Sequence, residues 1–353
     1  MKGVILAGGE GTRLRPLTLH LPKPTAPIAD RPLLRHQLDL LGRAGVDEIV
    51  FSLAYQPERI QAVFGDGRAF GMKIHYAVEH TPLGTGGAVK NAEPHLDETT
   101  IVFNGDVLMD VDLPAVVAEH KRQGAAATIV LTPVENPSAY GLVETDGEGR
   151  VLRFTEKPKD PSQITTNNIN AGIYVLQTST LGLMPANTTY SIERGFFPSL
   201  LGRGDLVRAH VHRGYWVDIG TPEKYLQVHR DILSGAFPVV LDGERRGDGG
   251  SVHKDARVSP AARLSGPFYI GPGCVVEDEA SIGAGAVLVK GVRVARAARV
   301  ADSVVWEGST LGPQSSVDGA LLASRVAIGA FASVGPGAVL GEGTIVSDYS
   351  RTR

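Results

Sequence analysis

Residues 4–13 read VILAGGEGTR, a short apolar run that passes directly into a loop with glycine at positions 8, 9 and 11. The apolar run predicts a buried strand, and the glycines indicate a backbone that needs unusual dihedral angles or a ligand in close approach. Successive N–H groups of such a loop can face phosphate oxygens, and Arg13 adds a permanently charged, forked donor. The stretch therefore predicts a phosphate-binding loop after the first strand.

A lysine held between two prolines follows this loop. Lys23 lies between Pro22 and Pro24, whose rings fix the local backbone. An ammonium on a stiff segment suits a triphosphate or its departing pyrophosphate. The loop is neither a G-x-G-x-x-G nor a Walker A motif, so a different class of phosphate loop is needed. A plain tight turn and an exposed lysine without a role are the alternatives.

The first 230 or so residues alternate short apolar strands with amphipathic helical stretches, which is an α/β pattern. We expect a helix from Leu33 to Ala44 and a strand from Glu48 to Ala54. Further strands are predicted at residues 73–77, 100–104, 127–132 and 171–176. A mixed, mostly parallel, doubly wound Rossmann-like sheet fits this order, and such sheets bind ligands outside the carboxyl ends of their strands.

Beyond about Phe237 the helical pattern stops, and an apolar residue recurs at every sixth position. A hexapeptide period predicts a left-handed parallel β-helix. Small residues that suit a narrow interior lie four positions after some of the apolar ones: Cys274, Ala280, Ala286 and Ala298. The apolar series, shortened by one residue after 300 and again after 317, is Val252, Val258, Leu264, Ile270, Val276, Ile282, Leu288, Val294, Val300, Val305, Leu311, Val317, Leu322, Ile328, Val334, Leu340 and Val346.

Two domains are predicted, a catalytic one over residues 1–235 and a β-helix over residues 236–353. The length of 353 residues and the linker-like composition of residues 243–250 support this division. A net charge of −3 with no cluster of basic residues argues against nucleic acid as a partner. The single cysteine, Cys274, and the absence of any apolar run of 18 residues favour a reduced, cytoplasmic, non-membrane protein.

The stretch from Gly8 to Pro24 resembles the signature of the sugar nucleotidyltransferases, also called nucleotide-sugar pyrophosphorylases. Further motifs of that family follow in the same order along the chain. They are Leu83-Gly84-Thr85-Gly86-Gly87, Asn104-Gly105-Asp106, Tyr140-Gly141, Phe154-x-Glu156-Lys157-Pro158, Asn170-Ala171-Gly172 and Trp216-x-Asp218-Ile219-Gly220-Thr221-Pro222.

The resemblance implies a role for each matched residue. The expected nucleotide-binding residues are Leu6, Ala7, Gly8, Gly9, Gly11, Thr12, Arg13, Lys23, Gly84 and Thr85. The expected sugar-phosphate-binding residues are Gly141, Glu156, Lys157 and Asn170. The expected catalytic set is Arg13, Lys23, Asp106 and Asp218. The two aspartates suit Mg²⁺, which keeps several waters and bridges substrate phosphates.

The predicted reaction joins a nucleoside triphosphate and a sugar 1-phosphate with release of pyrophosphate, by in-line attack on the α-phosphorus. Residues 82–86 resemble the mannose-1-phosphate guanylyltransferases, which implies GTP, mannose 1-phosphate and GDP-mannose. A thymidylyl, uridylyl or adenylyl transfer to glucose 1-phosphate stays open, as does a non-catalytic homologue that binds a nucleotide sugar and regulates a partner.

The β-helix has two possible roles of its own. We expect it to join copies of the chain into a homo-oligomer. Hexapeptide β-helices also host acyl transfer, which usually needs a histidine between coils, and His253 is the only histidine after residue 230. A second, acyltransferase activity is the weaker of the two hypotheses because it depends on this one residue.

Overall fold

The computed structural model describes residues 1–352 and divides them into two compact units. Unit 1 combines Met1–Gly9 with Leu34–Trp216, and unit 2 combines Glu10–Leu33 with the chain from Val217 onward. The segments 10–33 and 217–235 therefore belong to the same compact unit as the hexapeptide region. The division of the chain at residue 235 stays a prediction.

Unit 1 is built on a nine-stranded sheet with the order β10-β9-β11-β6-β1-β4-β5, to which β8 is added beside β11 and β12 beside β8. The central strand β1 is parallel to both neighbours, β4 and β6, whereas β11 is antiparallel to β6. This confirms the mixed, mostly parallel Rossmann-like sheet. The strands are β1 Lys2–Leu6, β4 Glu48–Leu53, β5 Lys73–Val78, β6 Thr99–Asn104, β8 Ala127–Pro133, β9 Gly141–Thr145, β10 Val151–Glu156, β11 Asn168–Gln177 and β12 Val207–Val211.

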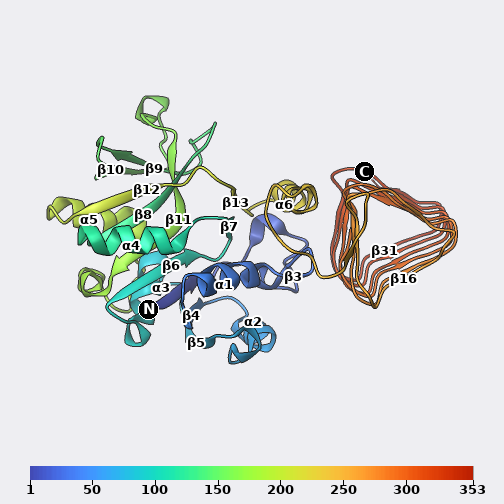
Figure 1. The fold of residues 1–353 in the computed structure, drawn as a ribbon, viewed down its shortest axis with the longest axis horizontal. Coiled ribbons are helices and arrows are strands. Elements are labelled where there is room, and N and C mark those ends of the chain that lie inside the picture. The colour runs from blue at the N-terminus through green and yellow to red at the C-terminus, as the bar shows by residue number, and fades with distance from the viewer. Residues whose placement is uncertain (353) are drawn as a thin grey trace. The chain divides into compact units, whose positions relative to one another are not determined.

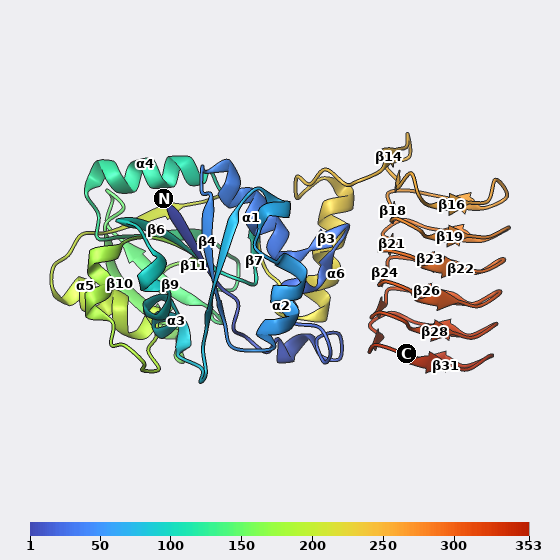
Figure 2. The same cartoon turned by 90° about the horizontal axis from the view of Figure 1, so that it is seen from below.

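Helices cover both faces of this sheet, and Figure 2 shows α3 and α4 on opposite sides of it. Neighbouring residues of β1 divide the core: Ile5 packs in the cluster that includes α1, α2 and α4, and Val4 in the cluster that includes α3 and α5. The helices are α1 Leu33–Arg43, α2 Pro57–Phe64, α3 Gly84–Ala92, α4 Leu113–Gln123 and α5 Phe197–Gly202, with a π-helical turn over Ile192–Phe196. No helix among residues 1–352 is long and apolar enough to cross a bilayer.

Short elements complete the chain outside the main sheet. Two-residue strands β2 Pro27–Ile28 and β3 Arg31–Pro32 pair with each other, and α6 Pro222–Ser234 precedes the hexapeptide region. The strand β7 covers Val107–Met109, and β13 covers Trp216–Asp218. The 3-10 turns are Thr12–Leu14, Lys23–Thr25, Arg68–Phe70, Glu93–His95, Pro161–Gln163 and Thr178–Leu183.

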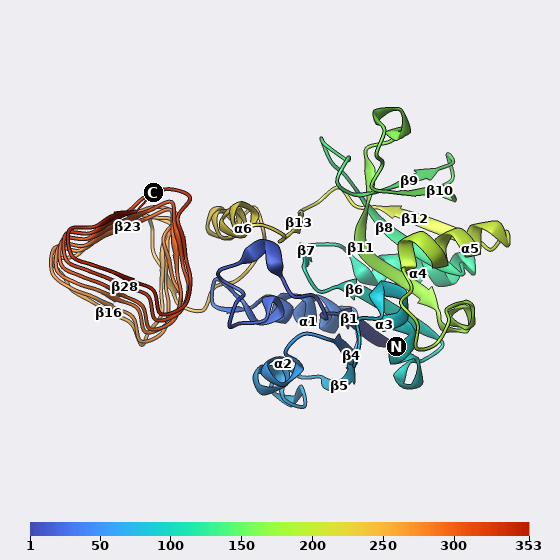
Figure 3. The ribbon, with the colours of Figure 1, turned by 180° about the vertical axis from the view of Figure 1, so that it is seen from behind.

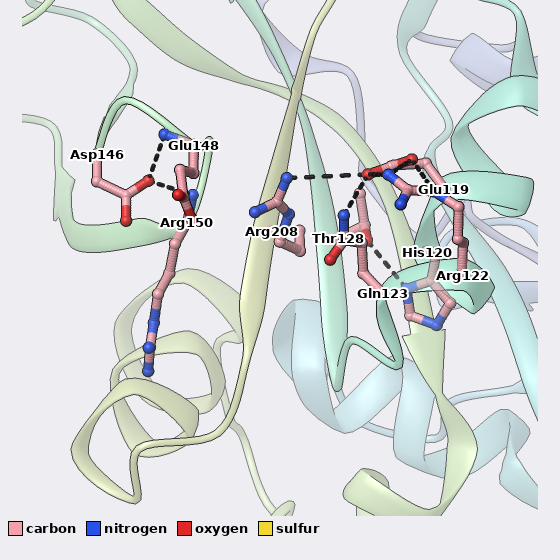
Figure 4. Close-up of polar contacts among 9 residues, drawn as sticks. All are labelled: Glu119, His120, Arg122, Gln123, Thr128, Asp146, Glu148, Arg150 and Arg208. Atoms are coloured by element: carbon pink, nitrogen blue, oxygen red, sulfur yellow. Dashed lines mark hydrogen bonds and ion pairs between the residues drawn. The ribbon is translucent and has the colours of Figure 1, made fainter.

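Polar contacts anchor α4 to the strands at one edge of the sheet (Figure 4). The carboxylate of Glu119 accepts hydrogen bonds from Arg122 and lies 3.8 Å from Nη2 of Arg208 on β12. The hydrogen bond from Arg122 is the main reason that the pKa of Glu119 lies below its usual range. One residue on, Nδ1 of His120 lies 2.9 Å from the Thr128 hydroxyl of β8. These contacts hold α4 against β8 and β12, at an edge of the sheet that carries no predicted site residue.

The hexapeptide region forms three parallel sheets of two- or three-residue strands, stacked as coils of triangular section (Figure 1). Every predicted apolar position is the second residue of one of these strands, which confirms the period and both shortenings. The three sheets are β15-β18-β21-β24-β27-β30, β16-β19-β22-β25-β28-β31 and β17-β20-β23-β26-β29-β32, with β14 added antiparallel to β15. Figure 3 shows β23 and β28 on different sides of the triangle. The architecture is consistent with a left-handed β-helix.

The bounds of these strands follow the sequence period. They are β14 Glu244–Arg245, β15 Ser251–Val252, β16 Arg257–Val258, β17 Arg263–Leu264, β18 Tyr269–Ile270, β19 Val275–Val276, β20 Ser281–Ile282, β21 Val287–Leu288, β22 Arg293–Val294, β23 Arg299–Ala301, β24 Val304–Val305, β25 Thr310–Leu311, β26 Ser316–Asp318, β27 Leu321–Leu322, β28 Ala327–Ile328, β29 Ser333–Val334, β30 Val339–Leu340, β31 Ile345–Val346 and β32 Arg351–Thr352. The small residue Cys274 is buried among them, and burial raises the pKa of its thiol to about 11.

Candidate active site

The glycine loop and the predicted metal aspartate leave adjacent parallel strands at the same edge of the sheet in unit 1. Leu6, the last residue of β1, is in register with Asn104, the last residue of β6. The N–H of Gly105 donates to the Leu6 carbonyl at 2.9 Å. A Cβ at position 105 would lie only 2.7 Å from that oxygen, so the close approach requires glycine. The turn that contains Asp106 therefore lies beside the glycine loop, which starts at Ala7.

Glu79 lies close to the glycine loop, and the sequence analysis did not identify it. Its carboxylate is buried and accepts from the Ser52 hydroxyl at 3.0 Å and from the Leu83 N–H at 2.8 Å. A Cβ on Gly8 would lie 3.5 Å from Oε1 of Glu79. A charged residue directly after the apolar strand β5 was the available signal. Glu79 connects the glycine loop with the start of the segment that resembles a base-binding loop.

That segment is clamped by the backbone of Tyr190. Tyr190 donates its N–H to the Leu83 carbonyl at 2.8 Å and accepts from the Gly86 N–H at 2.9 Å. Gly84 has a φ of +69°, and a Cβ there would lie 2.8 Å from the Tyr190 carbonyl oxygen. Both the left-handed conformation and the close contact require glycine. The resemblance therefore identified a segment whose backbone is fixed by residues about 100 positions away.

Glu193 is the centre of a hydrogen-bond network beside the same segment. One carboxylate oxygen accepts from the hydroxyls of Thr85 and Ser191, both at 2.7 Å, and the other accepts from the Tyr174 hydroxyl at 3.3 Å. Ser191 also accepts from the Arg194 N–H and so caps the π-helical turn. The sequence patterns did not reveal this network.

The network continues to a predicted sugar-binding residue. The Asn170 side-chain amide donates to the Tyr174 hydroxyl at 2.7 Å, and its carbonyl oxygen accepts from the Gly172 N–H at 3.0 Å. Burial raises the pKa of the Tyr174 phenol well above its ordinary value, so this hydroxyl stays protonated and donates to Glu193. One chain of hydrogen bonds thus joins Asn170 to Thr85, a residue of the expected base-binding segment.

The hairpin of β9 and β10 brings together three of the predicted sugar-phosphate residues. Gly141 is paired with Glu156, and a Cβ at 141 would lie 2.6 Å from the Glu156 carboxylate. Burial, and then the charge of Glu193, raise the pKa of Glu156, while Lys157 opposes the shift with its ammonium 3.8 Å away. Lys157 has a φ of +47°, a conformation that costs a non-glycine residue about 1–2 kcal/mol. Such strain is often found at functional sites.

The second half of the signature lies in unit 2, where a tight turn places Lys23 against the loop. Gly11 has a φ of +64°, and its carbonyl accepts from the Thr18 hydroxyl at 2.7 Å. A Cβ on Gly11 would lie 3.1 Å from the Lys23 Cβ. Lys23 is only 8% exposed and begins a 3-10 turn with the following proline. The neighbouring Thr12 is exposed and begins a 3-10 turn of its own.

Arg13 is positioned by a glycine more than 200 residues further along the chain. A Cβ on Gly220 would lie 2.6 Å from Nη1 of Arg13, so the guanidinium packs against the backbone of Gly220, where any side chain would clash. Gly220 donates its N–H to the carbonyl of Asp218 at 2.9 Å, and Asp218 is half-buried. Unit 2 therefore brings together the two motifs that supply Arg13 and the second predicted metal carboxylate.

The predicted site residues thus fall into two groups, and their individual roles stay predictions. Unit 1 holds Leu6, Ala7, Gly8, Gly9, Gly84, Thr85, Asp106, Gly141, Glu156, Lys157 and Asn170. Unit 2 holds Gly11, Thr12, Arg13, Lys23 and Asp218.

The chemistry of the two aspartates fits a divalent cation that is held partly by its substrates. Among residues 1–352, no three His, Cys, Asp or Glu side chains gather into a complete metal cage. Asp106 and Asp218 offer hard carboxylate oxygens, and both are partly exposed. A cation bound by one or two carboxylates keeps positions for water and substrate phosphate, as Mg²⁺ does in phosphoryl-transfer sites.

Comparison with known proteins agrees with both halves of this description. The family described as nucleotidyl transferase matches residues 2–235, and the family described as GMPPB C-terminal domain matches residues 251–351. The mannose-1-phosphate guanylyltransferase of Mycobacterium tuberculosis is 41% identical over 293 residues, which cover 82% of this chain and 80% of that protein.

Two further relatives widen the comparison. The UTP–glucose-1-phosphate uridylyltransferase of Synechocystis is 34% identical over 349 residues, which cover 94% of this chain and 88% of that protein. The crystal structure of HddC from Yersinia pseudotuberculosis complexed with GMP-PN is similar with a TM-score of 0.55 and 31% identity, covering 64% of this chain and 97% of HddC.

Proposed function

The chain belongs to the nucleotidyl transferase family, and we propose that it transfers a guanylyl group from GTP to mannose 1-phosphate, forming GDP-mannose and pyrophosphate. The observation that carries the proposal is the pairing of Leu6 with Asn104, because it sets the glycine loop beside Asp106 at the carboxyl edge of parallel strands. The 41% identity to the guanylyltransferase of Mycobacterium tuberculosis supports the choice of guanine and mannose.

The transfer needs no nucleophile from the protein. A phosphate oxygen of mannose 1-phosphate attacks the α-phosphorus of GTP, and the bond from that phosphorus to pyrophosphate breaks as the new bond forms. The attacking phosphate is already anionic near pH 7, so the protein's contribution is alignment and neutralisation of charge. The N–H groups of Gly8 and Gly9, with Arg13 and Lys23, are proposed to hold the triphosphate and the departing pyrophosphate.

Other residues of the chain orient the acceptor. Glu156 is proposed to accept hydrogen bonds from sugar hydroxyls, and Lys157 to neutralise the sugar phosphate. Family members generally use a divalent metal, which we propose to be Mg²⁺ held by Asp106 and Asp218, and which neutralises phosphate charge when bound. We also propose that copies of the chain assemble through the β-helix.

A uridylyl transfer to glucose 1-phosphate is the second candidate function, because the Synechocystis uridylyltransferase matches 94% of this chain. Pyrophosphate release should be measured with Mg²⁺, each of GTP, UTP, dTTP and ATP, and either mannose 1-phosphate or glucose 1-phosphate. We expect GTP with mannose 1-phosphate to give a kcat/KM at least about 100-fold above every other pair, a difference of roughly 2.7 kcal/mol.

A faster reaction of UTP with glucose 1-phosphate would replace the proposed function by the second candidate. If no pair releases pyrophosphate while GDP-mannose still binds, the chain is instead a regulatory homologue that has kept the binding site and lost the reaction.

A further inference from the structure

The β-helix shares unit 2 with both segments of the predicted phosphate-binding machinery, residues 10–33 and 217–234. Two features of the β-helix contact these segments directly. Neither contact is explained by the oligomerisation that the hexapeptide repeat suggested.

The first contact begins at Trp306, a buried side chain in the coil that contains β24. Its Nε1–H donates to the hydroxyl of Tyr225 on α6 at 3.0 Å, and the two rings meet edge to face with centroids 6.0 Å apart. The Tyr225 hydroxyl in turn donates a short hydrogen bond to the Pro27 carbonyl. Pro27 lies two residues after the 3-10 turn Lys23–Thr25. Two successive hydrogen bonds, the first of them buried, therefore connect the β-helix to the segment that follows this lysine.

A second residue of α6 holds the same segment. Nδ1 of the buried His229 lies 2.8 Å from the Tyr225 carbonyl, and Nε2 accepts from the Ala29 N–H at 3.1 Å. Because a carbonyl can only accept, the ring proton is on Nδ1, and Nε2 acts as the acceptor. Residues 27–29 are thus fixed to α6 at both ends.

The second contact joins the last coils of the β-helix to the signature loop. Gly341, directly after β30, lies so close to Pro16 that a Cβ at 341 would be 3.1 Å from the Pro16 Cβ. Pro16 lies between Arg13 and Thr18, the residue that hydrogen-bonds to the Gly11 carbonyl. Gly341 does not have a left-handed φ, so the effect of a Cβ at this position would come from crowding against Pro16.

We propose that the β-helix is part of the transfer machinery, with Trp306 and Gly341 as positioning residues that fix Lys23 and Arg13 for the nucleotide phosphates. The proposal rests on the proposed function only in naming the substrates. We call the contacts of Trp306 and Gly341 with α6 and the loop the brace. Because the predicted ligands of the sugar phosphate belong to unit 1, loss of the brace should weaken the binding of GTP and pyrophosphate and leave the binding of mannose 1-phosphate unchanged.

The test compares Trp306→Phe and Tyr225→Phe with a matched control, Tyr269→Phe. Tyr269 is also buried in unit 2, and its hydroxyl has no hydrogen-bond partner among the described residues, so the control removes a hydroxyl without breaking a contact. We expect the first two variants to raise KM for GTP, and for pyrophosphate in the reverse reaction, about 3- to 10-fold, the scale of one buried hydrogen bond. KM for mannose 1-phosphate should stay within about twofold.

A second pair of variants tests the contact at Pro16. Gly341→Ala and Gly283→Ala each place a Cβ 3.1 Å from another Cβ, that of Pro16 in the first case and that of Ala301 on the next coil in the second. Only Gly341→Ala should raise KM for GTP and pyrophosphate. Equal effects of both glycine variants, or equal rises in KM for GTP and mannose 1-phosphate, would overturn the proposal.

Failure of the proposed function can be told apart from failure of the brace. If the unaltered protein does not turn over GTP with mannose 1-phosphate, binding of pyrophosphate with Mg²⁺ is measured by calorimetry in place of KM. Weaker binding by Trp306→Phe than by Tyr269→Phe would support the brace, and equal binding would overturn it.

Discussion

The two units hold their predicted site residues by different physical means. In unit 1, the residues expected to contact base and sugar are joined by partly buried hydrogen bonds through Glu193 and Tyr174. In unit 2, Arg13 and Lys23 lie on a loop that is braced by close packing and by the β-helix. We therefore expect the effect of a substitution on catalysis to depend on which of these two kinds of support it removes.

The largest effect is expected from the aspartates, of which each unit supplies one. Asp106→Ala and Asp218→Ala should each lower kcat by about 1,000-fold or more, because either change removes a proposed ligand of the metal that would neutralise phosphate charge. Steady-state rates at saturating Mg²⁺ give the measurement.

The control for these variants is Asp66→Ala, since Asp66 is exposed and pairs with the exposed Arg68. Its rate should equal that of the unaltered protein. A loss below tenfold for Asp106→Ala or Asp218→Ala would remove that residue from the proposed metal site.

A substitution in the interior of the β-helix tests whether lower stability alone can reproduce the loss of the brace. Ile282 is fully buried on β20, so Ile282→Ala should lower the free energy of unfolding by about 2–4 kcal/mol. Denaturant unfolding measures this loss, and the KM values for GTP and mannose 1-phosphate should not change at temperatures where the variant is folded. A selective rise in KM for GTP would mean that general loosening of the coils mimics the loss of Trp306.

In unit 1, removing the charge of Glu193, the centre of the hydrogen-bond network, should lower activity. Glu193→Gln replaces an acceptor of three hydroxyl donors by an amide that has one acceptor oxygen. We expect kcat/KM to fall about 10- to 100-fold, with both substrates affected because the network reaches Asn170 and Thr85. Ser191→Ala, which removes one donor and the cap, should have a smaller effect, and the reverse order would contradict the central place of Glu193.

The smallest effect concerns the pH dependence of stability. Because the pKa of Glu156 is raised in the folded protein by burial and by Glu193, the folded state binds this proton more tightly than the unfolded state. Stability from this group is complete below the unfolded pKa, near 4.5, and is lost as pH rises through the folded value. Glu156→Gln should therefore raise the melting temperature relative to the unaltered protein more at pH 7 than at pH 4. An equal difference at both pH values would contradict the raised pKa.

Local patterns predicted the elements of the fold well, for reasons that differ between the units. In the β-helix, each coil pairs only with its neighbours, so the position of Val276 or Ile282 in the period determines its place in the structure. In the sheet, apolar runs identified β1, β4 and β6, but their order depends on pairing between distant segments, which periodicity does not encode.

The contacts that position the site residues were harder to predict from the sequence. Glycine motifs marked Gly11 and Gly220, but nothing local indicated that Gly220 lies against Arg13, because the contact joins segments 200 residues apart. Glu79 and Glu193 look like ordinary charged residues in the sequence, and their importance is visible only through the hydroxyls and N–H groups around them. Trp306 directly follows Val305 of the apolar series, and no local pattern indicates its contact with Tyr225.

The proposed transfer is tested most directly by following oxygen. Mannose 1-phosphate labelled with ¹⁸O at its three non-bridging phosphate oxygens is incubated with GTP and Mg²⁺, and both products are analysed by mass spectrometry. Attack by the sugar phosphate on the α-phosphorus predicts that GDP-mannose retains all the label and that pyrophosphate contains none. Label in pyrophosphate, or GDP-mannose that lacks it, would contradict the account.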